Sequence, residues 1–137
     1  MTIKKIFILF IIFVSQFFGQ QKNENEDFQN FIVMFFALEE LQKERTVFPL
    51  EYCYYEDYPE KTKTTFITEE NWKPLVDSIY VKSHYFRNIY DNFGHKMRDT
   101  GERVFAYEGN ETGTAIYYYF ALRDNKWFLI KKEDFSD

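Results

Sequence analysis

Two long apolar segments joined by a short polar turn constrain the fold more than any other feature of the sequence. Residues 114–123 and 126–132 have the β-branched and aromatic composition of strands, and Asp124-Asn125 between them is typical of a turn. A two-residue turn would place Phe120 opposite Leu129. One face of this hairpin would then carry Ile116, Tyr118, Phe120, Leu122, Trp127 and Leu129, and the other Ala115, Tyr117, Tyr119, Ala121, Phe128 and Ile130. Because both faces are apolar, we expect the sheet to be covered on both sides or to enclose a ligand.

Residues 23–45 have the pattern of one long helix. Apolar side chains recur three or four residues apart along one face, and Pro49 prevents the helix from continuing. Asn23 and Glu26 have the spacing of a capping box at its start. Residues 32–38 are apolar almost all round, which predicts that the helix is covered on more than one side.

The segments between this helix and the hairpin favour short strands joined by turns. We expect extended structure at 48–55, 61–68 and 102–108, turns at 56–60 and 109–113, and one helical turn at 69–73. Residues 78–93 fit two patterns, because Ile79 and Val81 alternate as in a strand whereas Phe86, Ile89, Tyr90 and Phe93 have helical spacing, and we favour a strand at 82–90. A helix followed by strands in this order indicates an α+β domain.

The first part of the sequence, residues 1–19, has the three-part layout of a secretory signal peptide. Lys4 and Lys5 are basic, residues 6–14 are an unbroken apolar run, and Gly19 precedes a polar stretch. A membrane-spanning helix needs roughly 20 apolar residues, so this run is too short to be one. We therefore expect an exported protein, periplasmic or secreted, with a single domain at 20–137 and no stable membrane anchor after cleavage.

The balance of charge and the cysteine count exclude some classes of partner and bond. The chain has 17 Lys and Arg against 22 Asp and Glu. Loss of Lys4 and Lys5 with the signal peptide leaves 15 basic residues and a net charge of −7. Because nucleic acids are bound by clustered Lys and Arg, we expect no nucleic-acid partner. Cys53 is the only cysteine, so the chain has no internal disulfide, and we expect Cys53 to pack as a small apolar side chain.

Several short motifs give the chain a resemblance to a known family. They are Phe48-Pro49-Leu50, Trp72-Lys73, Tyr85-Phe86, Ile89-Tyr90-Asp91-Asn92, Met97, Tyr118-Tyr119-Phe120 and Trp127-Phe128-Leu129. Over most of residues 24–135 the chain resembles an exported bacterial family described as a domain of unknown function (4348). The resemblance implies a nuclear-transport-factor-2-like, cystatin-like cone, in which a long N-terminal helix packs on a strongly curved antiparallel sheet. That family has no assigned catalytic residues, so none is carried over to this chain.

Few residues are candidates for chemistry. Asp91 and His84 are the candidates for a general base, because cone-type domains that are enzymes use an Asp or His inside the cone. His95 and Asp99 are four residues apart in a charged stretch, and we expect them to form only a local surface pair. The sequence has no ligand spacing typical of zinc or calcium and no glycine-rich phosphate loop, so we expect neither a metal nor a cofactor.

The sequence favours a non-catalytic binding module over an enzyme. Our leading hypothesis is that the sheet binds a small apolar ligand or a partner protein, with Tyr117, Tyr119, Ala121 and Phe128 as binding residues. One alternative is a small cone-type enzyme that uses a pocket Asp or His as general base. Another is an envelope inhibitor, or an assembly subunit that forms a homodimer through the open face of the sheet.

Overall fold

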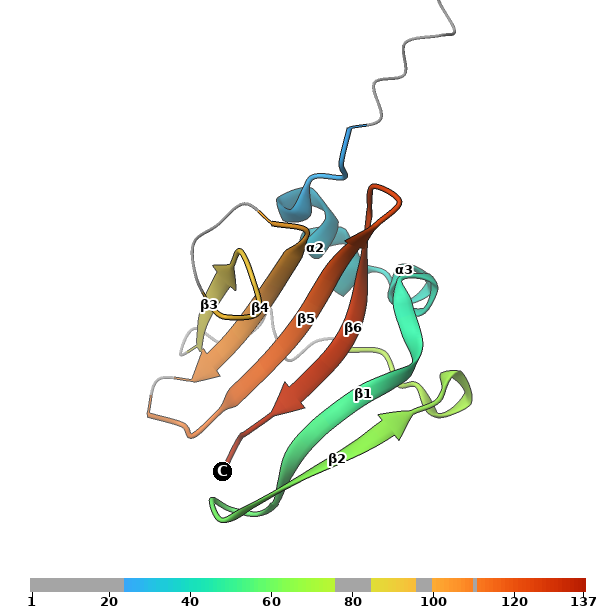
Figure 1. The fold of residues 1–137 in the computed structure, drawn as a ribbon. Helices are drawn as coiled ribbons and strands as arrows, with labels where there is room; N and C mark the ends of the chain where they lie inside the picture. Colours follow the sequence, from blue (N-terminus) through green and yellow to red (C-terminus); the bar gives the residue numbers. More distant parts are fainter. Residues whose placement is uncertain (1–23, 76–84, 96–99, 110) are drawn as a thin grey trace, which may run out of the picture.

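The computed structural model describes residues 24–75, 85–95, 100–109 and 111–137, which form two helices and a six-stranded sheet (Figure 1). The elements are α2 (Phe28–Ala37), α3 (Glu39–Glu44), β1 (Thr46–Asp57), β2 (Lys61–Ile67), a 3-10 turn (Glu69–Asn71), β3 (Tyr85–Tyr90), β4 (Glu102–Gly109), β5 (Ala115–Arg123) and β6 (Lys126–Asp134). The expected α+β class is therefore confirmed. The predicted signal peptide, Asn23 and His84 lie outside the described residues. None of the helices in the described ranges is long and apolar enough to cross a membrane.

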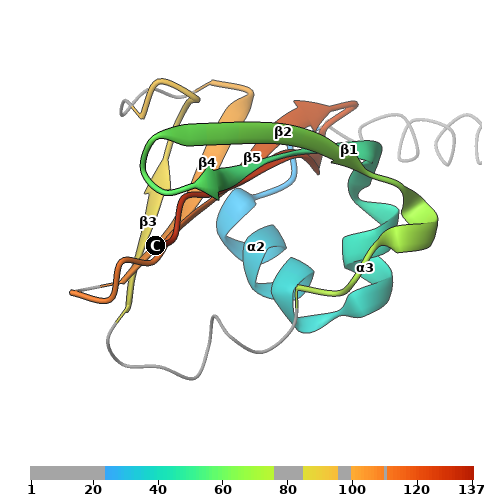
Figure 2. The same ribbon diagram turned by 90° about the horizontal axis from the view of Figure 1, so that it is seen from below.

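The strands form one curled, unclosed sheet in the order β2-β1-β6-β5-β4-β3, and Figure 2 shows both helices on its concave side. All neighbouring strands are antiparallel except β1 and β6, which run parallel. The expectation of a wholly antiparallel sheet is therefore wrong at this pair. A tight turn forces antiparallel pairing only on strands that follow each other directly, and no such turn joins β1 to β6.

The single long helix predicted for residues 23–45 is also wrong, because the structure has two short helices. Leu38 is extended, with φ −125° and ψ 113°, and separates α2 from α3. The first helix begins later than predicted, with Asp27 as its cap: the Asp27 side chain accepts a hydrogen bond of 2.8 Å from the Asn30 amide. The break lets α3 leave the direction of α2, so that the wholly buried Gln42 reaches the segment after the 3-10 turn, where its Oε1 accepts a 2.7 Å hydrogen bond from the Leu75 amide.

Aromatic rings fill the core between α2 and the sheet. Phe120 lies at the centre, wholly buried, with ring centroids of Phe28, Phe31 and Phe35 at 5.5, 5.7 and 5.3 Å. These are edge-to-face contacts, the arrangement that aromatic quadrupoles favour. The outer side of α2 is different, because Val33 and Met34 remain 54% and 48% exposed. The expected covering of this helix on more than one side is therefore not found.

The β5–β6 hairpin has the predicted register, with Phe120 opposite Leu129 and Leu122 opposite Trp127. Its turn residues Asp124 and Asn125 both have positive φ, 48° and 62°, as the two-residue turns that match strand twist require. Asn and Asp tolerate this backbone region better than other non-glycine residues, which explains why no glycine is needed here. A register shift between Tyr119 and Phe120 then adds one residue to β6.

Candidate functional site

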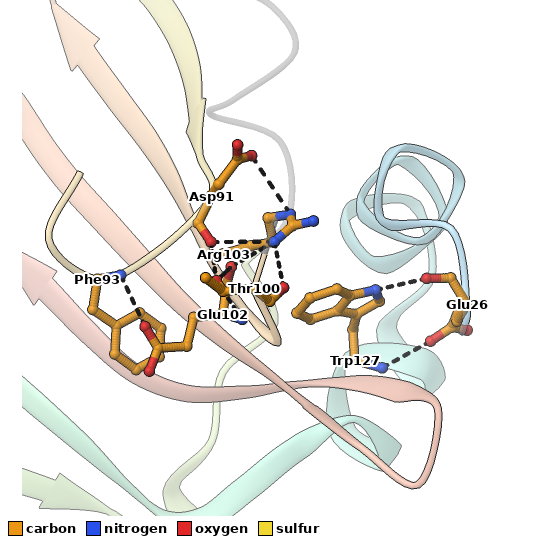
Figure 3. Close-up of polar contacts among 7 residues, drawn as sticks. All are labelled: Glu26, Asp91, Phe93, Thr100, Glu102, Arg103 and Trp127. Atoms are coloured by element: carbon orange, nitrogen blue, oxygen red, sulfur yellow. Dashed lines mark hydrogen bonds and ion pairs between the residues drawn. The ribbon is translucent and has the colours of Figure 1, made fainter. Parts of the chain in front are cut away.

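A cavity of about 370 Å³ lies where the start of α2 meets β6 and the facing ends of β3 and β4. Its wall is mainly polar, although two aromatic and two aliphatic side chains contribute. The lining residues are Asn25, Glu26, Asp27, Phe28, Gln29, Ile89, Asp91, Thr100, Arg103, Leu122 and Trp127. Figure 3 shows that Asp91 and Arg103 form one side, that Glu26 lies on the other, and that the Trp127 indole lies between them.

Glu26 ties the segment before α2 to the start of β6 (Figure 3). The Trp127 backbone N–H donates to Glu26 Oε2 at 2.9 Å, and the Trp127 indole Nε1–H donates to the Glu26 carbonyl at 2.7 Å. The Glu26 amide in turn donates to the Asn125 carbonyl at 2.9 Å. Arg45, whose side chain is 9% exposed, donates to Glu26 Oε2 at 2.9 Å. Glu26 therefore holds both the β5–β6 turn and the Trp127 indole in place, and its negative charge is balanced by the buried guanidinium of Arg45.

Arg103 holds the opposite side of the cavity. Its Nη1 donates to three backbone carbonyls, those of Thr100 at 2.7 Å, Glu102 at 2.8 Å and Asp91 at 3.2 Å. Its guanidinium carbon lies 5.1 Å from the centre of the Trp127 ring, within the range of a cation–π contact. The three carbonyls and the ring fix the guanidinium at the wall without neutralising its charge.

Asp91 lies just after β3, beside this guanidinium. Asp91 Oδ1 is 3.9 Å from Arg103 Nε, which is an ion pair but too long for a hydrogen bond. The backbone here is fixed separately, since the Thr100 hydroxyl donates to the Asp91 carbonyl. The Asp91 carboxylate therefore lies at the cavity wall, where Arg103 balances its charge and its oxygens can still accept hydrogen bonds.

The cavity can bind hydrogen-bond donors. Asp91, Asp27 and Glu26 contribute three carboxylates to its lining: Glu26 is paired with Arg45, Asp27 Oδ1 accepts from the Asn30 amide, and Asp91 is paired with Arg103 at 3.9 Å. Asn25 and Gln29 add amide groups that both donate and accept, and hence suit hydroxyl groups. A ligand that offers amine or hydroxyl hydrogens would match this wall better than an apolar one.

Only one of the two candidate general bases can be placed in the structure. Asp91 lines the cavity, whereas His84 and Asp99 lie outside the described residues. His95 lies beyond the other face of the sheet, stacked on Tyr90 with ring centroids 4.6 Å apart. His95 is also 5.6 Å from the ring of Tyr117. The structure thus brings Asp91 together with Arg103, not with His95.

Two of the predicted binding residues, Tyr117 and Tyr119, lie on the face of β5 that points away from α2. The segment after β3 covers them: the Phe93 ring is 5.4 Å from that of Tyr119, which is only 8% exposed. Their hydroxyl groups donate to carboxylates, Tyr117 to Glu108 at 3.0 Å and Tyr119 to Glu133 at 2.5 Å. We call Tyr117, Tyr119, Phe93 and His95 the outer tyrosine cluster.

Burial, together with the carboxylate partners, raises the pKa of both tyrosines in this cluster. The pKa of Tyr117 rises to about 12, and that of Tyr119 also rises. Both phenols therefore stay protonated at neutral pH and act as hydrogen-bond donors.

The other two predicted binding residues, Ala121 and Phe128, form a separate pair. They lie opposite each other in the β5–β6 ladder. Ala121 alternates onto the same face of β5 as Tyr117 and Tyr119, and the Phe128 ring lies 5.4 Å from the Arg45 guanidinium carbon.

Sequence reasoning missed the two charged residues that shape the cavity. Glu26 fits a capping box, so its pattern gave a local explanation that concealed contacts with Trp127, 101 residues away. Arg103 could have been identified from the sequence, because it is a basic residue at the start of the apolar run 104–107. Charged residues beside buried segments usually have a partner.

Other site types find little support in the described ranges. These residues contain no group of three or more His, Cys, Asp or Glu side chains that could hold a metal. Cys53 is a free thiol and is only half-buried, less buried than expected for a small apolar side chain.

Comparison with known proteins places the chain in a family and a fold. The model of the family described as a domain of unknown function (DUF4348) matches residues 16–97. An NTF2-like protein from Bacteroides fragilis is similar in structure, with a TM-score of 0.62 and 24% identity over 85% of this chain and 50% of that protein. This chain thus spans half the length of that protein. A protein from Bacteroides uniformis, solved by NMR, has a TM-score of 0.53 and 21% identity over 80% of this chain and 76% of its own.

No curated protein of assigned function is significantly similar to this chain. At 24% and 21% identity the two solved structures establish the fold and nothing about activity. The family match covers more than half of the chain, and the similar structure from Bacteroides fragilis is that of an NTF2-like protein. The chain therefore belongs to the DUF4348 family and has an NTF2-like fold.

Proposed function

We propose that this chain is a non-catalytic binding domain of an exported protein, and that the cavity beside Asp91 and Trp127 takes a small polar molecule rich in amine or hydroxyl groups. Its volume of about 370 Å³ is in the range of small-ligand sites. The wall is more polar than expected from the apolar faces of the sheet, so a polar ligand fits this cavity better than the apolar one that the sequence suggests.

The observation that carries this proposal is the Asp91 carboxylate. It lies in the cavity wall with its charge balanced by Arg103 at 3.9 Å, yet that distance leaves its oxygens able to accept hydrogen bonds. A hydrogen bond from a ligand to a charged acceptor contributes about 1.5–3 kcal/mol.

Binding is a better reading of this cavity than catalysis. The described residues that line it include no histidine, cysteine, serine or lysine, and its Thr100 hydroxyl and the carboxylates of Glu26 and Asp27 are engaged in structural hydrogen bonds. Asp91 is the one predicted general base in it, and its charge partner Arg103 is held by three backbone carbonyls. Such a rigid ion pair suits ligand positioning.

The test uses the Trp127 indole as a reporter. The chain has two tryptophans, and the Nε1–H of Trp127 donates to the Glu26 carbonyl at the cavity wall. Titration of isotope-labelled protein with glucosamine, which carries both amine and hydroxyl groups, should shift the Trp127 indole NMR signal in a saturable way. Glucose and ethanolamine separate the contributions of the hydroxyl groups and the amine.

A matched pair of variants makes this test specific. Asp91→Asn removes the charge and should weaken glucosamine binding about ten-fold. Asp57→Asn makes the same change at an exposed position at the end of β1 and should leave binding unchanged. Equal binding by both variants, or no shift of the Trp127 signal with any of the three probes, would remove the proposal. Chemical conversion of a bound probe that stops in Asp91→Asn would favour the enzyme alternative.

A further inference from the structure

A second concavity, of about 380 Å³, lies beside the core between the end of β2, the segment after the 3-10 turn and β6. Its walls are mainly apolar, from Phe66, Ile67, Trp72, Pro74 and Leu75, and its charges come from Lys73 and Lys132. We call this concavity the lysine groove. It shares no lining residue with the cavity at Asp91.

The lysine groove is positively charged, whereas the protein as a whole is negatively charged. The chain has a net charge of −5, yet both charged residues in the described lining of the groove are cationic. Lys132 is set deep: its side chain is 17% exposed, and its ammonium lies 4.9 Å from the centre of the Tyr52 ring. Lys73 is at the exposed rim. An anion is thus favoured at the inner end of the groove as well as at its mouth.

The inner lysine is incompletely satisfied. The nearest carboxylate, Asp134 Oδ2, is 3.7 Å from Lys132 Nζ, longer than a hydrogen bond. Burial lowers the pKa of Lys132, because the charged ammonium is disfavoured away from water. An incoming carboxylate would relieve that cost by supplying a charged acceptor.

Two further donors beside the groove lack acceptors. The Trp72 indole Nε1–H and the Nε2 of the Gln42 side chain are both buried without a hydrogen-bond partner in the described part of the chain. Gln42 is held against the groove by its bond from the Leu75 amide. Unsatisfied buried donors are uncommon in native proteins, and they reinforce the excess of donors over acceptors in this region.

From these observations we propose that the lysine groove binds a small free carboxylic acid with an apolar body. The carboxylate would lie near Lys132 and the apolar body would lie against Trp72, Ile67 and Leu75. An anion without an apolar body would leave these walls wetted, and an apolar molecule without an acid would leave the donors unpaired. This site is independent of the proposed function at the Asp91 cavity.

The experiment again uses an indole reporter, now that of Trp72. Phenylacetate is the probe, with phenylacetamide and phenethylamine as matched neutral and cationic controls. Phenylacetate should shift the Trp72 indole signal in a saturable way and leave that of Trp127 unchanged, whereas both controls should bind at least ten-fold more weakly. Binding of phenylacetamide as tight as that of phenylacetate, or no shift of Trp72, would overturn the proposal.

Lysine variants test where the carboxylate of phenylacetate binds in the groove. Lys132→Gln should weaken phenylacetate binding about ten-fold or more, and Lys73→Gln, at the exposed rim, a few-fold. Lys126→Gln, an exposed lysine in the β5–β6 hairpin, should bind like the unmodified protein. If Lys132→Gln does not fold, Lys73→Gln decides: unchanged affinity in that variant contradicts the proposal. Because Trp72 and Trp127 report separately, failure at one site leaves the result at the other intact.

Discussion

The two faces of strand β5 use aromatic rings in different ways. On the side of α2, Phe120 is wholly buried and contacts other rings edge to face. On the opposite side Tyr117 and Tyr119 are also covered, but their hydroxyl groups donate to Glu108 and Glu133. The first face is stabilised by burial of apolar area, and the second adds hydrogen bonds to charged groups. Neighbouring residues of β5 therefore stabilise the fold through different interactions, and substitutions on each face can measure the two contributions separately.

The largest effect should come from the α2 face. Phe120→Ala leaves a cavity among Phe28, Phe31 and Phe35 and should lower the free energy of unfolding by about 3–5 kcal/mol. Phe66→Ala is the control, because Phe66 is 61% exposed, and it should change stability by about 0.5 kcal/mol or less. Denaturant unfolding measures both. Similar losses in the two variants would mean that burial in the core does not set the stability of this face.

The polar edge of the same face should come next. Glu26→Gln removes the charge that faces the buried Arg45 and weakens the acceptor of the Trp127 amide, so we expect a loss of about 2 kcal/mol. Glu44→Gln is a matched control, because Glu44 also lies 3.5 Å from Arg45 but is 68% exposed. Its loss should be below about 1 kcal/mol, as for other surface ion pairs. A larger loss for Glu44→Gln would refute the role given to Glu26.

A smaller effect should follow from removing one hydroxyl on the outer face. Tyr119→Phe deletes the hydrogen bond to Glu133 and should cost about 1–2 kcal/mol. Tyr118→Phe makes the same change one residue away on the α2 face, where the described residues provide no hydrogen bond to that hydroxyl, and we expect a change within about 0.5 kcal/mol. The comparison of the two faces would fail if both variants lost the same stability.

Tyr117→Phe also removes a hydrogen bond to a carboxylate, but Tyr117 is less buried than Tyr119, so at neutral pH we expect a smaller loss than for Tyr119→Phe, with a further effect in alkali. The pKa of Tyr117 is raised from an ordinary 10.0 to about 12, chiefly by burial and then by Glu108, so the folded state holds the phenolic proton more tightly than the unfolded state. This contribution to stability is complete below pH 10 and is lost as pH rises through 12. The free energy of unfolding should therefore fall less steeply with pH in Tyr117→Phe than in the unmodified protein. Identical slopes in the two proteins would contradict the raised pKa given to Tyr117.

Local patterns predicted the parts of the fold that local chemistry decides. The strand ends, the Asp124-Asn125 turn and the pairing of Phe120 with Leu129 all follow from alternation and turn preference within about twenty residues. The helix break at Leu38 did not follow, because leucine is a good helix former and only the placement of α3 against the rest of the fold favours an extended residue there. The parallel pairing of β1 with β6 was equally hidden, since it joins distant segments.

The candidate site was predictable only in part for the same reason. Asp91 could be chosen because the resemblance implies a cone in which an Asp or His can act as general base, and it does line a cavity. Its partner Arg103 and the anchor Glu26 could not be paired with it from sequence, because the contacts of Glu26 with Trp127 cross most of the chain. Residues whose roles depend on such distant partners leave little local pattern to read.

The central place of β6 in the sheet has a consequence for folding during synthesis. Strands β1 and β2 form a hairpin and strands β3, β4 and β5 a meander, and within the described sheet these two units are joined through β6, which follows both in the sequence. Until residue 134 has been made, the β1–β2 hairpin lacks its partner strand in the sheet, and its contacts are those of the core that Leu50 shares with Phe28 and Phe35 of α2. The described sheet is therefore complete only once β6 has been made, and the pairing of β6 with β1 then brings two distant segments of the chain side by side.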